Sequence, residues 1–569
     1  MGNYKRNGCE SVFLYKIGKH SQENKLVPRS MKLRFSLSIL IISSLVGIWR
    51  SPEVKAAEKI SFRYGMVEFT LPVASLENFA STGKVDRYLN IYLDSATPQE
   101  LARLQELANY SLEVDRVTVY RFFNSSLGQK ILQNLGTIIQ PSPTEEGLYA
   151  LRSSLISAAG DTEGLSILNT IRSYPSETIY INGKNGLKLA NTFGRLKKRT
   201  RKAIAVIAER ADLESIAELN IDFTQKLDLR KSGIFSSTKE VLSFRDRDRQ
   251  RSFTANLYRP QLHTNIPTII ISPGLGGDSR SFDYLARHLV SYGFAVVVVN
   301  HPGSDSQRIN NFFKGIDREI VEAREFIDRP QDISYLLDRL QQREAAYPPR
   351  QRLNLRRVGI IGHSFGAYTA LALAGGKINV RGLQRSCQQQ KVANNSLNLS
   401  LLLQCLATEL PKNKKQRLSD SRIKAAFVLN PMNSLLFGKP GLSKIKTPVA
   451  FVSGGNDMVT PPLSEQIIPF TWLKNDDKYL FSIKNGGHTY VDPQHLEAGK
   501  NRALVKNSNL EIYHDYFRAT TLAFMQNYLV RNHNYADYLS SDYAKYISRQ
   551  PLEFNLVSEL EPYHLNRRK

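Results

Sequence analysis

The chain has 569 residues, of which 41% are hydrophobic and 23% are charged, and its formal net charge is +25. These proportions are ordinary for a folded globular protein and exclude both a disordered chain and a collagen-like fibre. The length allows two or three domains, and the basic charge favours anionic partners without fixing the fold. The sequence has no zinc-finger spacing, RNA-recognition signature or basic zipper, so nucleic acid is not predicted as a partner.

An export signal is predicted near the N-terminus. From Met31 the sequence has two cationic residues, a mainly apolar run over residues 35–48, and then small residues before position 58. This order is typical of a secretory signal peptide, and a run of about 14 residues is shorter than the roughly 20 that a spanning helix needs. We therefore predict that residues 1–57 are a leader and signal peptide, with Met31 as an alternative start, and that the mature protein is periplasmic or secreted. An uncleaved membrane anchor is the alternative.

Residues 58–235 are predicted to form a mainly helical N-terminal domain. Apolar residues recur at spacings of three and four in TPQELARLQELANY, GLYALRSSLISAAG and EGLSILNTIRSY. Two shorter stretches with extended character, KISFRYGMVEFTL and SETIYING, interrupt these helices. No period of about 20 to 50 residues recurs, which argues against a solenoid.

A basic segment lies near the end of this domain. Six cationic residues occur between Arg195 and Lys202, ahead of an amphipathic helical pattern. A solvated helix face is the simpler interpretation, and contact with an anionic membrane surface is the functional alternative.

From about residue 240 the pattern changes to alternating strands and helices, over a predicted catalytic domain of residues 236–535 followed by a C-terminal tail of residues 536–569. Six apolar runs are predicted to be buried strands: PTIIISPG, FAVVVVNHPG, RVGIIGHS, KAAFVLNP, TPVAFVSGGND and KYLFSIKNGGH. Such strands separated by helices indicate a mostly parallel sheet with helices on both faces. The ligand site of such a sheet lies at the carboxyl ends of its strands.

The stretch VGIIGHSFGAYTALALAGG predicts a nucleophilic serine at position 364. Gly-His-Ser-Phe-Gly stands between an apolar strand and an apolar helix, so a sharp turn there lifts Ser364 clear of the sheet. Gly362 and Gly366 leave room for the crowded backbone of this elbow. The following helix directs its positive N-terminal end at the site, where negative charge develops.

Two further residues complete a predicted catalytic triad. Asp457 ends a strand in VSGGND and His488 follows the last strand in KNGGH, so the chain order is Ser364, Asp457, His488. His488 would take the serine proton and return it to the leaving group, and Asp457 would hold the imidazole in the required tautomer. A helix cap and a loop histidine are the plainer interpretations of each residue alone.

Two backbone amides are predicted to form the oxyanion hole. One belongs to Phe365, the residue after the nucleophile, and the second to the loop SPGLGGDSRSF after the first predicted strand. The glycines of that loop let amides turn inward, and we choose Leu275 as the second donor. A plain glycine turn is the alternative.

A polar insertion near residues 376–422 is longer than a crossover helix needs and is predicted to form a cap over the pocket. Cys387 and Cys405 lie within it, 18 residues apart, and export would expose them to an oxidising compartment. We predict a disulfide between them, with two buried thiols as the alternative.

Residues 240–530 resemble the serine α/β-hydrolases, which implies an α/β-hydrolase fold preceded by the helical N-terminal domain. SPGLGG with GHSFGAYTA is similar to the platelet-activating-factor acetylhydrolase and polyester-hydrolase branch. In that branch the hydrophobic residue after the first glycine and the residue after the nucleophile form the oxyanion hole, and Leu275 and Phe365 hold those places. Pro273 stands where the acetylhydrolases carry histidine.

The whole chain resembles a bacterial group described as predicted dienelactone hydrolases or lipases, whose uncharacterised N-terminal domain is similar to residues 60–200. Dienelactone hydrolases proper use a cysteine nucleophile, whereas this sequence has Ser364. The name of that group therefore does not fix the substrate.

The predicted function is hydrolysis of a lipid or short acyl ester by an exported serine hydrolase. Acyl transfer, thioester hydrolysis or other chemistry of the same site, and a non-catalytic binding protein on this fold, are the alternatives. No metal or cofactor is predicted, because the sequence has no H-E-x-x-H motif, no dinucleotide-binding fingerprint and no P-loop.

Overall fold

The structure is a computed structural model that describes residues 56–217, 221–262, 264–388, 398–411, 417–489 and 509–566. All but the end of the predicted leader and signal peptide therefore lies outside the described residues. Ala56–Lys569 form one compact unit, so the predicted division near residue 235 remains a prediction from the sequence pattern. None of the helices in these ranges combines the length and the apolar run that a bilayer crossing requires.

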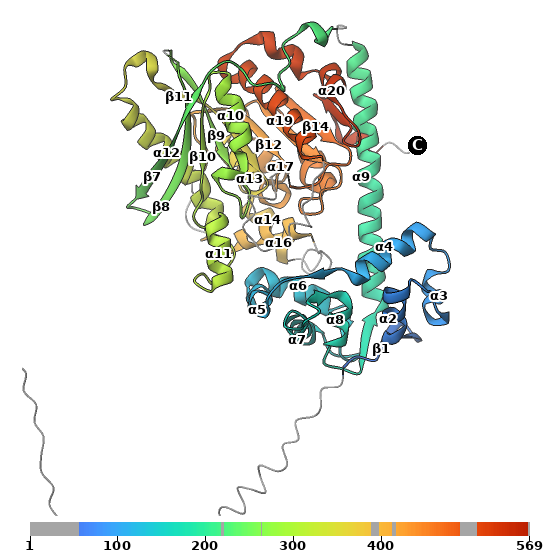
Figure 1. Cartoon of the computed structure of the whole chain (residues 1–569). Helices are drawn as coiled ribbons and strands as arrows, with labels where there is room; N and C mark the ends of the chain where they lie inside the picture. The colour runs from blue at the N-terminus through green and yellow to red at the C-terminus, as the bar shows by residue number, and fades with distance from the viewer. Residues whose placement is uncertain are drawn as a thin grey trace, which may run out of the picture. The chain divides into compact units, whose positions relative to one another are not determined.

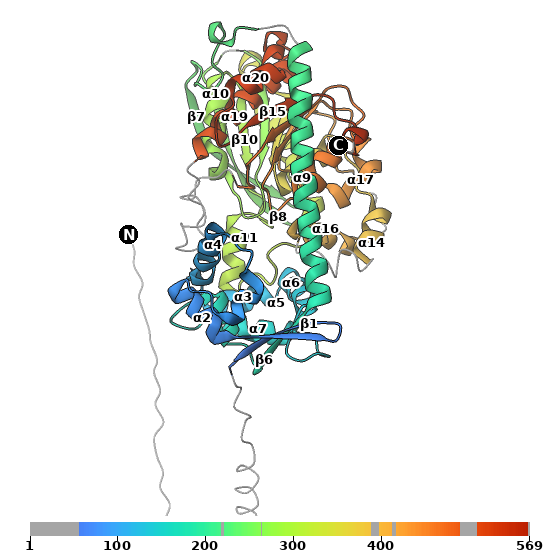
Figure 2. The same cartoon turned by 90° about the vertical axis from the view of Figure 1, so that its right-hand side faces the viewer.

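The N-terminal part packs short helices around a small sheet with strand order β2-β1-β6-β4 (Figure 2). The two stretches predicted to be extended form β1 and β2 in one case and β6 in the other. The elements are β1 (Lys59–Tyr64), β2 (Val67–Pro72), α2 (Val73–Thr82), α3 (Arg87–Leu93), α4 (Pro98–Asn109), β3 (Ser111–Leu112), α5 (Arg116–Asn124), α6 (Ser126–Gly136), β4 (Ile139–Gln140), α7 (Leu148–Ala158), β5 (Leu165–Ser166), α8 (Ile167–Arg172) and β6 (Thr178–Asn182).

A single long helix, α9 (Gly183–Ala217), follows β6 and continues alongside the larger sheet (Figure 1). Its basic segment, from Arg195 to Lys202, has exposed cationic side chains. Beyond that segment Ile207 and Ala211 are fully buried in the same apolar core as the catalytic part. The helix therefore combines a solvated cationic stretch with an anchoring apolar face.

The larger sheet has nine strands in the order β15-β14-β13-β12-β11-β9-β10-β8-β7. All six predicted strands are present, and they run parallel to their neighbours in the centre of the sheet. These six are β9 (Ile266–Ser272), β10 (Ala295–Val299), β11 (Leu353–His363), β12 (Ile423–Leu429), β13 (Val449–Gly454) and β14 (Lys478–Ile483).

Antiparallel strands that the sequence pattern did not predict extend both edges of the sheet. On one side β7 (Ser237–Asp246) pairs with β8 (Arg251–Pro260), which pairs with β10. On the other side β15 (Phe554–Val557) pairs with β14. The interpretation of residues 536–569 as a tail is corrected here, because Phe554, Leu556 and Val557 are buried and complete the sheet.

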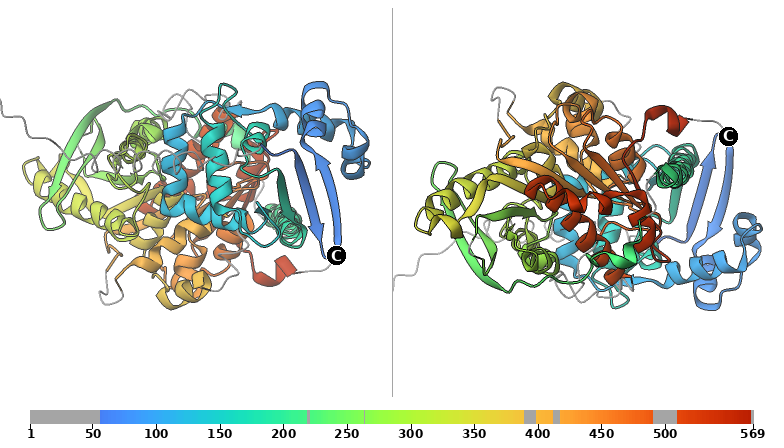
Figure 3. Two further views of the ribbon diagram at one scale, coloured as in Figure 1. Left: turned by 90° about the horizontal axis from the view of Figure 1, so that it is seen from below. Right: turned by 90° about the horizontal axis from the view of Figure 1, so that it is seen from above.

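Helices cover both faces of this sheet (Figure 3). Successive strand residues alternate between two apolar cores: Ile270 and Ile360 pack with α9, α12 and α13, whereas Ile271 and Ile361 pack with α10, α19 and α20. The helices of this part are α10 (Asp283–Ser291), α11 (Ser306–Lys314), α12 (Glu325–Glu344), α13 (Phe365–Leu373), α14 (Val380–Gln388), α16 (Leu399–Leu406), α17 (Ser434–Leu442), α18 (Ile468–Phe470), α19 (Leu510–Met525), α20 (Ser541–Ile547) and α21 (Pro562–Asn566).

His288, a buried residue of α10, is expected to make stability depend on pH. Burial, with the nearby charge of Arg518, lowers the pKa of His288 to about 4, although Asp515 opposes the shift. Below pH 6.5 the unfolded chain binds a proton that the folded chain does not bind until about pH 4, so this stability is lost as the pH falls. We expect the free energy of unfolding to decrease by about 2 kcal/mol from this residue between pH 7 and pH 5.

Urea unfolding of the wild type and of His288→Leu at both pH values measures this contribution. The leucine variant should lose about 2 kcal/mol less than the wild type over that interval. Equal losses in the two proteins would contradict the assignment to His288.

Candidate active site

The predicted nucleophile occupies a strained turn between β11 and α13. Ser364 has φ 54° and ψ −112°, a conformation that a residue with a side chain rarely adopts. Its N–H donates to the carbonyl oxygen of Leu429, at the end of the neighbouring strand, at 2.9 Å. This bond ties the turn to the carboxyl edge of the sheet and directs the serine side chain out of it.

The two elbow glycines are required by backbone crowding. A Cβ atom on Gly362 would lie 2.2 Å from the carbonyl oxygen of Gly366, and one on Gly366 would lie 1.9 Å from the carbonyl oxygen of Ser272. Both distances are shorter than a Cβ atom can approach a backbone oxygen, so any larger residue at either position would displace the elbow. Gly366 also brings the elbow against the loop that follows β9.

The structure brings the three predicted triad residues together. The Nε2 atom of His488 lies 3.0 Å from the Oγ atom of Ser364, and its Nδ1 atom lies 2.8 Å from Oδ2 of Asp457. The three residues follow β11, β13 and β14, whose carboxyl ends share one edge of the sheet. An imidazole so arranged can take the hydroxyl proton while a carboxylate stabilises its charged form.

Asp457 is buried but held in its ionised form. Burial alone raises its pKa, but the hydrogen bond from His488 and those from Thr460 outweigh that effect and leave the pKa lowered. Thr460 Oγ1 and Asn430 Nδ2 each donate to Oδ2 at 2.6 Å, and the amides of Val459 and Thr460 donate to Oδ1 at 2.8 Å. A carboxylate with this many donors stays charged and fixed in position.

Two supporting residues were missed by the sequence analysis. Asn430 follows β12 with φ 44°, and besides Asp457 it donates to the carbonyl oxygen of Gly487, beside His488. His363, inside the elbow motif, donates from Nε2 to the carbonyl oxygen of His488 at 2.9 Å, and burial lowers its pKa to about 3. A polar residue at the carboxyl end of a buried strand, as in KAAFVLNP, was a usable signal for Asn430.

The second oxyanion donor was predicted in the loop that follows β9. The amide of Gly276 donates to the carbonyl oxygen of Ser304 at 2.8 Å, and that of Gly277 to Gly274 at 3.1 Å. Within the described residues no such acceptor contacts the amides of Leu275 or Phe365. The oxyanion hole of Leu275 and Phe365 stays a prediction from the sequence.

The predicted cap insertion packs against the loop that carries Asp457. In this insertion the amide of Ser400 donates to the carbonyl oxygen of Val459, and Gln404 on α16 donates to the buried carboxylate of Glu465. The sulfur atoms of Cys387 and Cys405 lie 2.06 Å apart, so a disulfide joins α14 to α16 as expected from the sequence. Part of the insertion lies outside the described residues.

Loss of this disulfide is expected to lower the free energy of unfolding by about 3 kcal/mol, because it closes a short loop in the unfolded chain. The double variant Cys387→Ser, Cys405→Ser and the wild type should be compared by urea unfolding. Treatment of the wild type with a reductant should reproduce the variant's stability. A double variant as stable as the oxidised wild type would contradict the prediction.

The architecture is a mostly parallel sheet flanked by helices, with the elbow serine and its partners at the carboxyl edge. The fold is that of an α/β hydrolase. A family model described as "alpha/beta hydrolase fold" matches residues 267–383, and one described as "alpha/beta hydrolase of unknown function (DUF1400)" matches residues 56–182. No curated protein matches the chain.

These matches support hydrolase activity for this chain. They do not distinguish the acetylhydrolase branch or the dienelactone hydrolase group, so both resemblances remain predictions. The second match covers much of the predicted N-terminal domain and lies outside the nine-stranded sheet. Within the described ranges, no three His, Cys, Asp or Glu side chains gather in a way that could hold a metal ion.

Proposed function

We propose that the chain is a serine carboxylic ester hydrolase that acts on lipid or short acyl esters through a covalent acyl-enzyme. The observation that carries this proposal is the continuous hydrogen-bonded series from Ser364 through His488 to Asp457 on a strained elbow. A serine hydroxyl is a weak nucleophile at neutral pH, and this arrangement is what activates it.

In the first half of the reaction Ser364 Oγ attacks the ester carbonyl carbon while Nε2 of His488 takes the hydroxyl proton. The tetrahedral oxyanion accepts hydrogen bonds from the amides of Phe365 and Leu275. His488 then gives its proton to the departing alkoxide oxygen, and the acyl group remains bonded to Ser364.

In the second half His488 takes a proton from a water molecule, whose oxygen attacks the acyl carbon. The same two amides stabilise the second oxyanion, and the proton returns to Oγ of Ser364 as the carboxylic acid leaves. Asp457 keeps the Nδ1 proton of His488 in place throughout, which fixes Nε2 as the atom that exchanges protons.

Acyl transfer and thioester hydrolysis would use the same site. In acyl transfer a group other than water accepts the acyl group, and in thioester hydrolysis the leaving group is a thiol. A non-catalytic binding protein is the remaining alternative. The ionised Asp457 and its donors favour a working site over this last interpretation.

The purified protein should be assayed against esters with acyl chains of two to sixteen carbons and then treated with a fluorophosphonate. We expect turnover with a defined chain-length optimum and a single labelled peptide containing Ser364. Turnover with thioesters alone would favour the thioesterase alternative. Absence of both turnover and labelling would contradict the enzyme proposal and favour the binding protein.

We also propose export and contact with an anionic membrane surface, both on sequence grounds. The exposed cations of α9 between Arg195 and Lys202 support the second idea. N-terminal sequencing of the cell-derived protein tests the first, with an expected start near residue 58. Sedimentation with phosphatidylglycerol vesicles and with neutral vesicles tests the second.

A further inference from the structure

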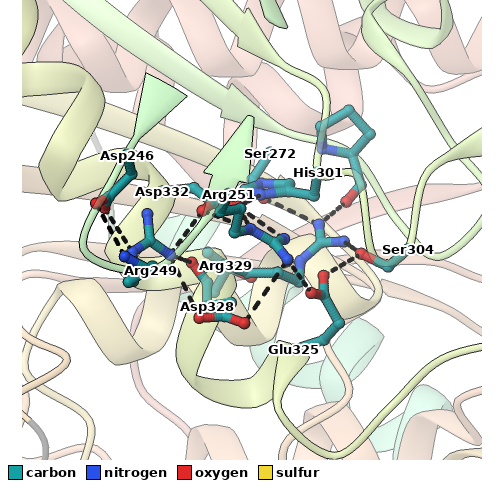
Figure 4. A network of polar contacts seen from close by, with 12 residues as sticks. Asp246, Arg249, Arg251, Ser272, His301, Ser304, Glu325, Asp328, Arg329 and Asp332 are labelled. Carbon is teal, nitrogen blue, oxygen red and sulfur yellow. Dashed lines mark hydrogen bonds and ion pairs between the residues drawn. The ribbon is translucent and has the colours of Figure 1, made fainter. Parts of the chain in front are cut away.

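Figure 4 shows a largely buried cluster of charged side chains that also contacts Ser272 and Ser304. It joins arginines from β8 and α12 and from the turn between β7 and β8 to carboxylates of α12 and to one carboxylate at the end of β7. Its charged members are Asp246, Arg249, Arg251, Glu325, Asp328, Arg329 and Asp332. Buried ions are costly unless they are paired and fully hydrogen-bonded, so a cluster of this size requires a reason beyond stability.

Arg329 is the most deeply buried cation of this cluster, with 1% of its surface exposed. Its side chain donates to four oxygen atoms that no other arginine of the cluster contacts. Nε donates to Thr369 Oγ1 at 3.1 Å, Nη1 to Ser304 Oγ at 2.6 Å, and Nη2 to both Ser272 Oγ and the carbonyl oxygen of Pro273. The guanidinium also lies 4.7 Å over the ring of Phe365.

Those partners belong to the three segments that set the geometry of the oxyanion hole. Ser272 ends β9, and Pro273 and Gly274 follow it and lead to the Leu275 amide. Ser304 lies in the loop after β10, and its carbonyl oxygen accepts the hydrogen bond from Gly276, on the other side of Leu275.

The third segment is the helix that follows the nucleophile. Thr369 lies on α13, where its Oγ1 also donates to the carbonyl oxygen of Phe365 at 3.1 Å. Phe365 carries the other proposed donor and packs its ring beneath the guanidinium. One side chain therefore contacts both segments that provide oxyanion donors.

We propose that Arg329 is a positioning residue that sets the distance and orientation of the Leu275 and Phe365 amides relative to each other. This inference rests on the proposed function. A planar guanidinium donates in fixed directions and can reach all four oxygens at once, whereas a lysine ammonium on the same helix cannot. An oxyanion hole acts through preorganised donors, so a small shift of one segment weakens it.

The rest of the cluster keeps this cation charged and oriented. Ser304 Oγ donates a hydrogen bond to Glu325 at 2.8 Å. Ser272 Oγ contacts His301, whose Nδ1 atom lies 3.0 Å from Asp332. Burial lowers the pKa of Arg329 to about 10, so it remains a cation at neutral pH.

The test compares Arg329→Lys and Arg329→Gln with the matched control Arg259→Gln. Arg259 forms a partly buried ion pair with Glu344, at the far end of the same helix α12. Two quantities are measured: kcat and KM on the best ester, and the affinity for an alkyl boronic acid, which forms a tetrahedral adduct with the serine. The thermal unfolding temperature is recorded for each variant.

We expect kcat of Arg329→Lys to fall about 10- to 100-fold with KM changed by less than about twofold, because only transition-state stabilisation is lost. The affinity for the boronic acid should fall by a similar factor. Arg259→Gln should unfold at a lower temperature and keep kcat within about twofold of the wild type. A loss of unfolding temperature in Arg329→Lys without a loss of kcat would overturn the proposal.

Thr369→Val and Thr369→Ser keep the inference testable if both Arg329 variants fail to fold. The valine variant removes the acceptor of Nε, so kcat should fall about 3- to 10-fold, and the serine variant should restore it. Equal kcat in the wild type and Thr369→Val would overturn the proposal. A wild type without ester turnover or fluorophosphonate labelling would instead show that the proposed function had failed.

Discussion

Replacement of Ser364 by alanine is expected to lower kcat on every ester substrate by about six orders of magnitude. The change removes the only atom that can form the acyl-enzyme in the proposed mechanism and leaves His488 without a proton to take. The elbow backbone keeps its hydrogen bond from the Ser364 amide to Leu429, so the fold should persist. Steady-state kinetics and fluorophosphonate labelling both report the effect.

Ser443→Ala is the matched control, because Ser443 directly follows α17 and its hydroxyl donates to the nearby carbonyl oxygen of Pro440. That variant should keep wild-type kcat and labelling. Substantial turnover by Ser364→Ala, with a normal unfolding temperature, would show that another group attacks the substrate.

The central part of the fold could be predicted because its strands are buried on both faces. A strand such as PTIIISPG is then apolar along its whole length and is easily recognised. The edge strand β7 could not be recognised in this way, since most of its side chains are exposed and STKEVLSFRD is rich in charges. Strand β15 has only four residues, which is too short for a pattern to stand out.

The grouping of Ser364, His488 and Asp457 could be predicted because each has a distinctive residue type near the end of an apolar strand. The roles of His363 and Arg329 could not, because they depend on partners that are distant in sequence. Arg329 stands in EFIDRPQDISYLLDR, a charged pattern that is typical of a solvated helix face. Only the packing of α12 against β9 and α13 shows that this face is buried.

Replacement of Asp457 by asparagine is expected to lower kcat by about four orders of magnitude while KM changes little. A carboxamide can donate to Nδ1 of His488, which favours the tautomer with its proton on Nε2 and leaves no base facing Ser364. It also cannot stabilise the positively charged imidazolium that forms during attack. Steady-state kinetics on the best ester measure the loss.

Asp420→Asn is the matched control, because Asp420 is a partly buried carboxylate that pairs with Arg422 at 2.6 Å, away from the triad. It should lower the unfolding temperature and leave kcat unchanged. A loss of less than about tenfold in Asp457→Asn would mean that His488 is oriented mainly by other contacts. His363 and Thr460 are contacts of His488 that could do so, since each bonds a different atom of that residue. Such a result would mean that the surrounding hydrogen bonds, and not the carboxylate, set the tautomer of His488.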